Sequence, residues 1–199
     1  WYCIFEENER KNALKAEFAA RPDKNRHPIV LQHGNNPGLV SHFTKEGISY
    51  IVSKQFPKDK YLKKLVKEGN FAEAARALGL KMVHVNDIDL QKVKGEYCDN
   101  VLYTTWCMDS FWFEMLSEAT MDVGTHESMD FAENVNDFGA EKGYFTFRQL
   151  AADKRCRTFY PGGGFEGYLV PHEETITIAK GLEIKENDKV VYRPTVMFL

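Results

Sequence analysis

The sequence lacks the patterns that mark disulfide frameworks and metal sites. Its four cysteines, Cys3, Cys98, Cys107 and Cys156, lie far apart and form no C-x-x-C pair. Such cysteines are typical of free thiols in a reducing compartment. The six histidines show no metal-ligand spacing, and no H-E-x-x-H motif occurs. We therefore predict no metal site and a cytoplasmic location.

Long apolar runs and an excess of positive charge are also absent. No stretch approaches the roughly 20 apolar residues that a membrane helix requires, and no signal-peptide pattern occurs. The formal net charge is -3, whereas a nucleic-acid-binding protein needs a basic surface to neutralise phosphates. The sequence therefore predicts neither a membrane nor a nucleic acid as a partner.

A dinucleotide-binding fingerprint is missing too. No G-x-G-x-x-G motif occurs, and Gly162-Gly163-Gly164 lacks the preceding strand and following helix of such a site. We interpret the three glycines as a turn. If this protein uses a dinucleotide, the main binding site lies outside this sequence.

What is present is the composition of one globular domain. Of 199 residues, 43% are apolar, which is enough to bury a core. Periodicity and cap residues predict helices over 6–20, 39–53, 58–69, 70–78, 109–118 and 172–180, with Asn70 and Asp109 as the N-caps of the fourth and fifth. They predict strands over 27–32, 81–86, 99–106, 120–126, 144–148, 155–160 and 166–170, and a final hairpin turning at Asn187-Asp188. Because helices and strands do not alternate strictly, we predict an α+β fold, with helices on one face of a mixed sheet in two layers.

Both ends of the sequence suggest a larger protein. The chain opens at Trp1 on an apolar run and stops on the apolar residues 196–199. We expect residues 1–199 to form one domain of a longer enzyme whose N-terminal Rossmann domain and C-terminal part are missing.

The turn from Gly34 to Gly38 is the most unusual local feature. A strand leading into a helix through Gly, Asn and Pro leaves backbone N–H groups that suit an anion or a polar cofactor group. Asn36 fits the N-cap and Pro37 the first helical position. An ordinary capped helix is the alternative interpretation.

A second group of residues is acidic and aromatic. Trp106 ends a predicted strand, Glu114 follows on a predicted helix, and Asp87 ends another strand. His172 and Glu174 add an imidazole and a further carboxylate. An indole face and carboxylates together suit an ammonium group. Taken singly, each carboxylate could be a solvated surface residue and Trp106 a core residue.

Five segments stand out in order along the chain: His33-Gly-Asn-Asn-Pro-Gly-Leu-Val-Ser-His-Phe43, Thr104-Thr-Trp-Cys-Met-Asp-Ser-Phe111, Gly124-Thr-His-Glu127, Leu169-Val-Pro-His-Glu-Glu-Thr-Ile-Thr-Ile178 and Val191-Tyr-Arg-Pro-Thr195. Together they resemble homospermidine synthase. Each is weak alone, but the ordered set is specific. The resemblance implies the substrate-binding middle domain of a saccharopine dehydrogenase-like, NAD-dependent enzyme.

The resemblance also implies an activity. Such an enzyme condenses two putrescine molecules to homospermidine and releases ammonia through imine intermediates. NAD is retained as a cofactor without net oxidation. The resemblance further implies a homodimer, and diamines related to putrescine as the other partners.

Site residues follow from the same resemblance. It implies catalytic roles for His172, Trp106 and Asn36. It places the cofactor against Asn36, Pro37 and Gly38. It implies substrate contacts for Glu114, Asp87 and Glu174, although Asp87 stands where the family has the longer glutamate. Where the family reads Gly-Trp-Gly-Thr, this chain has Asp122-Val123-Gly124, so Asp122 receives no role.

Two alternatives stay open. One is a related imine reductase of the saccharopine or carboxynorspermidine dehydrogenase group, whose carboxylate substrate would need an arginine such as Arg148, Arg157 or Arg193. The other is a non-catalytic polyamine-binding or dimerisation module.

Overall fold

The computed structural model describes residues 4–21, 30, 34, 37–88, 90–92, 94–101, 103–128, 135–137, 143–160 and 162–199. Of the strand predicted over 27–32, only Val30 is described, and it has no regular secondary structure. Asn36 lies outside the described residues, so its predicted contacts with cofactor and substrate stay predictions.

The helices follow the predicted ranges closely. They are α1 (Ile4–Ala20), α2 (Leu39–Gln55), α3 (Lys60–Lys67), α4 (Phe71–Ala77), α5 (Met108–Met115) and α6 (Glu174–Gly181). The Asp59 side chain caps α3, and the Asn70 side chain caps α4 as predicted.

Two predicted helix caps were wrong. The N-cap of α2 is Gly38, at φ 131°, rather than Asn36. A residue with a side chain rarely adopts such a φ, which explains a glycine here. The N-cap of α5 is Cys107 rather than Asp109, which lies in the first turn.

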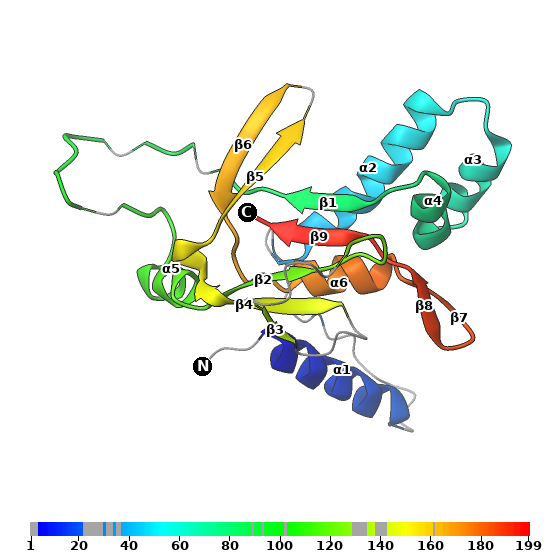
Figure 1. Cartoon of the computed structure of the whole chain (residues 1–199), viewed down its shortest axis with the longest axis horizontal. Helices are drawn as coiled ribbons and strands as arrows, with labels where there is room; N and C mark the ends of the chain where they lie inside the picture. Colours follow the sequence, from blue (N-terminus) through cyan, green and yellow to red (C-terminus); the bar gives the residue numbers. More distant parts are fainter. Residues whose placement is uncertain are drawn as a thin grey trace.

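A five-stranded mixed sheet forms the centre of the fold (Figure 1). Its strands, in order across the sheet, are β1 (Met82–Val85), β9 (Thr195–Phe198), β2 (Glu118–Asp122), β4 (Tyr144–Leu150) and β3 (Val135–Asp137). β1 and β9 are parallel, and the other pairs are antiparallel. The predicted α+β class is confirmed. β9 was not predicted as a separate strand, yet it lies inside the sheet between β1 and β2.

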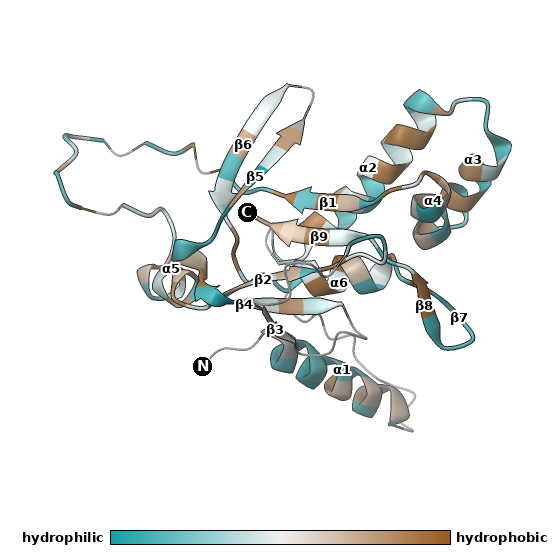
Figure 2. Cartoon of the chain, viewed as in Figure 1, coloured by the Kyte–Doolittle hydropathy of each residue, from teal (hydrophilic) through white to brown (hydrophobic). Residues whose placement is uncertain are grey.

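One face of the sheet carries helices. Val196 on β9 packs with Ile48 of α2 and with Ile178 and Ala179 of α6. Figure 2 shows hydrophobic residues along α2 and at the tip of β9. The N-terminal helix α1 joins this side through Lys11, which forms an ion pair with Glu173 just before α6.

The opposite face carries a β-hairpin instead of a helix. Strands β5 (Arg155–Tyr160) and β6 (Gly163–Tyr168) form a separate two-stranded sheet. At their base, Cys156 and Phe165 pack with Phe147 and Met197 of the sheet. The predicted two-layer arrangement therefore describes the helical side, and the hairpin adds a partial third layer.

A second hairpin lies near the C-terminus. Strands β7 (Ile184–Glu186) and β8 (Lys189–Tyr192) form the predicted hairpin, with Asn187 and Asp188 both at positive φ in its turn.

The strand predicted over 99–106 is wrong. Its described residues form a turn, a bend and irregular chain within the loop that extends away from the sheet in Figure 1. Among the described residues, no helix combines the length and apolar character needed to cross a bilayer.

Candidate active site

Three of the predicted site residues meet beside the sheet. His172 lies in the loop before α6, Glu174 is the first residue of α6, and Glu114 lies near the end of α5. His172 Nδ1 lies 3.1 Å from Glu174 Oε2, and His172 Nε2 forms an ion pair with Glu114 Oε1. Both imidazole nitrogens therefore face carboxylates that come from different helices.

The cluster is removed from solvent. The side chains of His172 and Glu114 are 16% and 17% exposed, and that of Glu174 is 1% exposed. Among the described residues, Glu174 Oε1 has no hydrogen-bond partner. A buried carboxylate oxygen without a partner is costly, so this atom is a ready acceptor for a cationic donor.

The backbone around His172 is fixed by local hydrogen bonds. Its N–H donates to Val170 O at 3.0 Å, and its carbonyl accepts from Thr175 Oγ1 at 2.7 Å. Val170 N in turn donates to Phe198 O on β9 at 3.1 Å. The His172 ring stacks on the Phe198 ring, with centroids 4.0 Å apart and planes at 14°.

The charge of the cluster follows from these contacts. Burial acts to lower the pKa of His172, but hydrogen bonds and charge from Glu114 and Glu174 outweigh it and raise the pKa to about 9. The imidazole is therefore protonated at neutral pH. With two carboxylates and one imidazolium, the cluster has one negative charge in excess.

A cleft of about 480 Å³ has Phe198 among its lining residues. It runs between the first turns of α2 and strand β1, and it is lined by Val40, Phe43, Thr44, Val83, His84, Val85, Asn86, Asp87 and Phe198. Asp87 is exposed, and its N–H donates to Leu199 O at 3.1 Å. The structure thus places Asp87 in a concave site that shares the Phe198 wall with the His172 cluster.

The described part of the predicted cofactor turn lies at the start of α2, next to the residues of that cleft. Gly34 N donates to Pro37 O at 2.8 Å, and Leu39 N donates to Gly34 O at 3.1 Å. The turn therefore uses the N–H of Leu39 internally, although the sequence predicted free N–H groups there. Pro37 and Gly38 lie before Val40 and Phe43, which line the cleft.

Trp106 is not part of the cluster. Its side chain is exposed, at 58%, in the irregular segment that precedes α5. Among the described residues, no hydrogen bond, ion pair or ring contact joins Trp106 to His172 or Glu114. Its predicted contact with a substrate cation stays a prediction.

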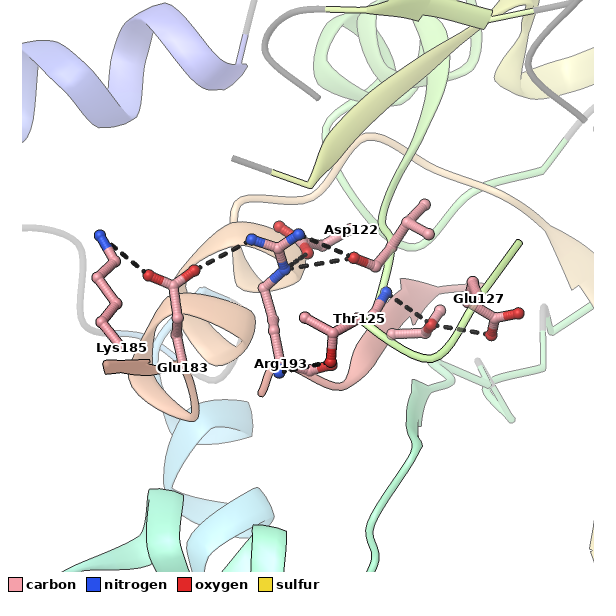
Figure 3. Close-up of polar contacts among 9 residues, drawn as sticks. Asp122, Thr125, Glu127, Glu183, Lys185 and Arg193 are labelled. Atoms are coloured by element: carbon pink, nitrogen blue, oxygen red, sulfur yellow. Dashed lines mark hydrogen bonds and ion pairs between the residues drawn. The ribbon is translucent and has the colours of Figure 1, made fainter. Parts of the chain in front are cut away.

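A second buried ionic cluster supports the sheet (Figure 3). Arg193, between β8 and β9, lies 2.9 Å from Asp122 and 3.0 Å from Glu183, and it donates two hydrogen bonds to Val123 O. Burial raises the pKa of Asp122 to about 8, while Arg193 acts to lower it. Sequence reasoning gave Asp122 no role and treated Arg193 as a possible carboxylate ligand. In the structure, the two side chains pair with each other inside the protein.

A metal site was not predicted. In the part of the chain that the structure describes, no group of three or more histidine, cysteine, aspartate and glutamate side chains is arranged to hold a metal ion.

Comparisons with known proteins address the resemblance. No protein-family model matches the chain. A homospermidine synthase of Mesorhizobium japonicum is 28% identical over 205 residues, which cover 98% of this chain and 42% of that protein. A homospermidine synthase of Blastochloris viridis is 30% identical over 170 residues, covering 81% of this chain and 34% of that protein.

A solved structure agrees with these relatives. The homospermidine synthase of Legionella pneumophila, in complex with NAD, superposes with a TM-score of 0.76 at 28% sequence identity. The match covers 94% of this chain and 40% of that one. The chain thus spans about two fifths of the length of these relatives. The predicted resemblance is confirmed: over nearly its whole length, this chain is related to one part of the homospermidine synthases.

Proposed function

We propose that this chain is the substrate-handling part of a homospermidine synthase. The reaction is the NAD-dependent condensation of two putrescine molecules to homospermidine, with release of ammonia through imine intermediates. In this proposal, a Rossmann domain outside the given sequence binds most of the dinucleotide. The enzyme is proposed to act as a cytoplasmic homodimer.

The observation that carries the proposal is the excess negative charge of a buried site. Glu114 and Glu174 flank one imidazolium, and Glu174 Oε1 lacks a partner among the described residues. Burying an uncompensated charge is unfavourable by several kcal/mol. An alkylammonium group would supply the missing positive charge and donate to the unpartnered oxygen. The site therefore fits one end of a diamine better than a neutral or anionic ligand.

The second ammonium group of putrescine needs an acid of its own. Asp87 lines the neighbouring cleft, whose walls at Val83, Val85 and Phe198 are apolar and suit the methylene chain. Because aspartate is one carbon shorter than the glutamate of the family, its contact with an ammonium can run through a water molecule. Trp106 retains its proposed role of facing a cation, which a tryptophan ring stabilises by about 0.5–2 kcal/mol.

His172 is proposed to hold and transfer a proton. At a pKa of about 9 it carries that proton at neutral pH, so it starts as an acid rather than as the near-neutral shuttle expected from an unperturbed imidazole. An ammonium group bound by Glu174 would weaken the stabilisation of the imidazolium. Substrate binding is therefore expected to lower the pKa of His172 and to promote proton transfer to the departing amine.

Few described residues can hold the cofactor. Pro37 and Gly38 lie at the N-terminus of α2, where the helix dipole favours an anionic or polar group, and they adjoin the cleft lined by Val40 and Phe43. NAD bound there would accept a hydride from the amine carbon and return it to the condensed imine. Asn36 is proposed to contact the same region, although it lies outside the described residues.

The related imine reductases are less compatible with this site. Their carboxylate substrates need an available arginine, but Arg193 is 5% exposed and paired with Asp122 and Glu183. Arg157 pairs with Glu166 on the exposed β5–β6 hairpin. Arg148, the third candidate, is exposed on β4 and does not line the cleft that contains Asp87.

The test is product formation. The full-length protein that contains this chain is incubated with putrescine and NAD, and homospermidine and ammonia are measured by mass spectrometry and a coupled ammonia assay. Both products are expected, without net formation of NADH. Binding of putrescine without any product would instead support a non-catalytic polyamine-binding module.

A further inference from the structure

Phe198 contacts the His172 cluster and also lines the cleft. One face of its ring stacks on the imidazole at 4.0 Å and 14°, and the same side chain lines the cleft beside Asp87. Phe198 is only 3% exposed. Since β9 lies inside the sheet, between β1 and β2, the ring is held by a strand with neighbours on both sides.

The backbone of Phe198 holds the same loop. Its carbonyl accepts from Val170 N, two residues before His172, and His172 N donates to Val170 O. Within the sheet, Phe198 is the register partner of Val85 in the neighbouring strand β1. One residue thus connects the sheet to the loop of His172 through both its backbone and its side chain.

A stacked ring restricts rotation of the imidazole about its Cβ–Cγ bond. That angle decides whether Nδ1 and Nε2 face Glu174 and Glu114 at the same time, because the carboxylates come from α6 and α5. The face of a phenylalanine ring also favours an imidazolium over a neutral imidazole. Both effects act on the group that the proposed function makes the proton donor.

We propose that Phe198 is a positioning residue, which holds the His172 ring in the plane that lets both of its nitrogens meet the two carboxylates. This inference rests on the proposed function for its catalytic consequence, but its structural part is independent of any activity. Phe198 does not contact the reacting atoms in this account. It acts through His172.

Two variants distinguish the effect of the aromatic ring of Phe198 from the effect of its side-chain volume. Phe198→Tyr keeps an aromatic face against His172, whereas Phe198→Met keeps an apolar side chain of similar size without a ring. The matched control is Phe145→Met. Phe145 is equally buried, at 3%, but it packs with Val123 on the opposite face of the sheet.

The primary measurement is an NMR titration of the His172 imidazole nitrogens in the three variants and the parent protein. In Phe198→Met, the midpoint is expected to fall by roughly 0.5 to 1 pH unit, the size of a lost cation–π contact. Phe198→Tyr should titrate like the parent. Phe145→Met should leave the midpoint unchanged even where it lowers the melting temperature.

The secondary measurement is the pH profile of homospermidine formation by the full-length protein. Phe198→Met is expected to move the alkaline limb to lower pH and to reduce kcat by roughly tenfold, with Phe198→Tyr restoring both. If the parent makes no homospermidine, the proposed function fails, but the titration still tests the stack. An unchanged titration in Phe198→Met, or an equal displacement in Phe145→Met, would overturn the positioning role.

Discussion

Replacing Glu114 with glutamine should reveal how strongly the two carboxylates hold the proton on His172. Together they raise the pKa of His172 from 6.5 to about 9 despite burial. That difference corresponds to a preference for the imidazolium on the order of 3 kcal/mol. If the two carboxylates contribute similarly, Glu114→Gln should lower the pKa of His172 by roughly 1 pH unit.

The same change should alter how stability depends on pH. Because the folded pKa of His172 lies above its unfolded value, the stabilisation is complete below about pH 6.5 and is lost as the pH rises through 9. Glu114→Gln should therefore cost about 1–2 kcal/mol of unfolding free energy at pH 6. It should cost less near pH 10, where the parent has also lost the imidazolium.

The assay combines denaturant unfolding between pH 6 and 10 with an NMR titration of His172. The control is Glu118→Gln, at the start of β2, which removes a carboxylate four residues away from Glu114. An identical His172 midpoint in Glu114→Gln and the parent would refute the ionic contact. So would a stability loss that does not vary with pH.

Three further changes test other parts of the structure. Gly143→Ala should destabilise the fold by more than about 2 kcal/mol. The reason is that Gly143 has φ +75° and an added Cβ would lie 1.7 Å from Arg193 Nη2. A melting temperature within experimental error of the parent would contradict this packing. Arg193→Met should cost about 3–5 kcal/mol, because it removes a buried guanidinium that pairs with Glu183 and donates to Val123 O. Arg157→Met on the exposed hairpin should cost under about 1 kcal/mol. Comparable losses of the two variants in urea unfolding would argue against the Arg193 cluster. Trp106→Leu should change stability by less than about 0.5 kcal/mol, since the side chain is exposed. It should nevertheless raise the KM of the full-length protein for putrescine. An unchanged KM would refute the proposed contact between Trp106 and the substrate cation.

Local sequence rules predicted much of the fold. The Asn70 cap and the Asn187-Asp188 turn act through atoms a few residues away, so they can be recognised without tertiary information. The strand predicted over 99–106 failed because β-branched and aromatic residues form a strand only where a neighbour pairs with them. β9 was missed for the reverse reason. Its four residues become a strand because β1 and β2 lie on either side.

The sequence could predict which residues belong to the site, but not how they contact one another. The resemblance identified Glu114, His172 and Glu174, which the fold brings together from α5 and the start of α6. It could not show the stacking of Phe198, because that contact depends on where β9 enters the sheet. The pairing of Arg193 with Asp122 was hidden for the same reason, since these residues are far apart in sequence and meet across the sheet.

The central claim is that a buried, net-negative cluster binds one end of a diamine. A crystal structure of the full-length protein soaked with NAD and putrescine tests it most directly. We expect an ammonium nitrogen within hydrogen-bond distance of Glu174 Oε1, with the methylene chain directed toward the cleft at Asp87. Putrescine bound elsewhere, with Glu174 Oε1 still unpartnered, would contradict the account.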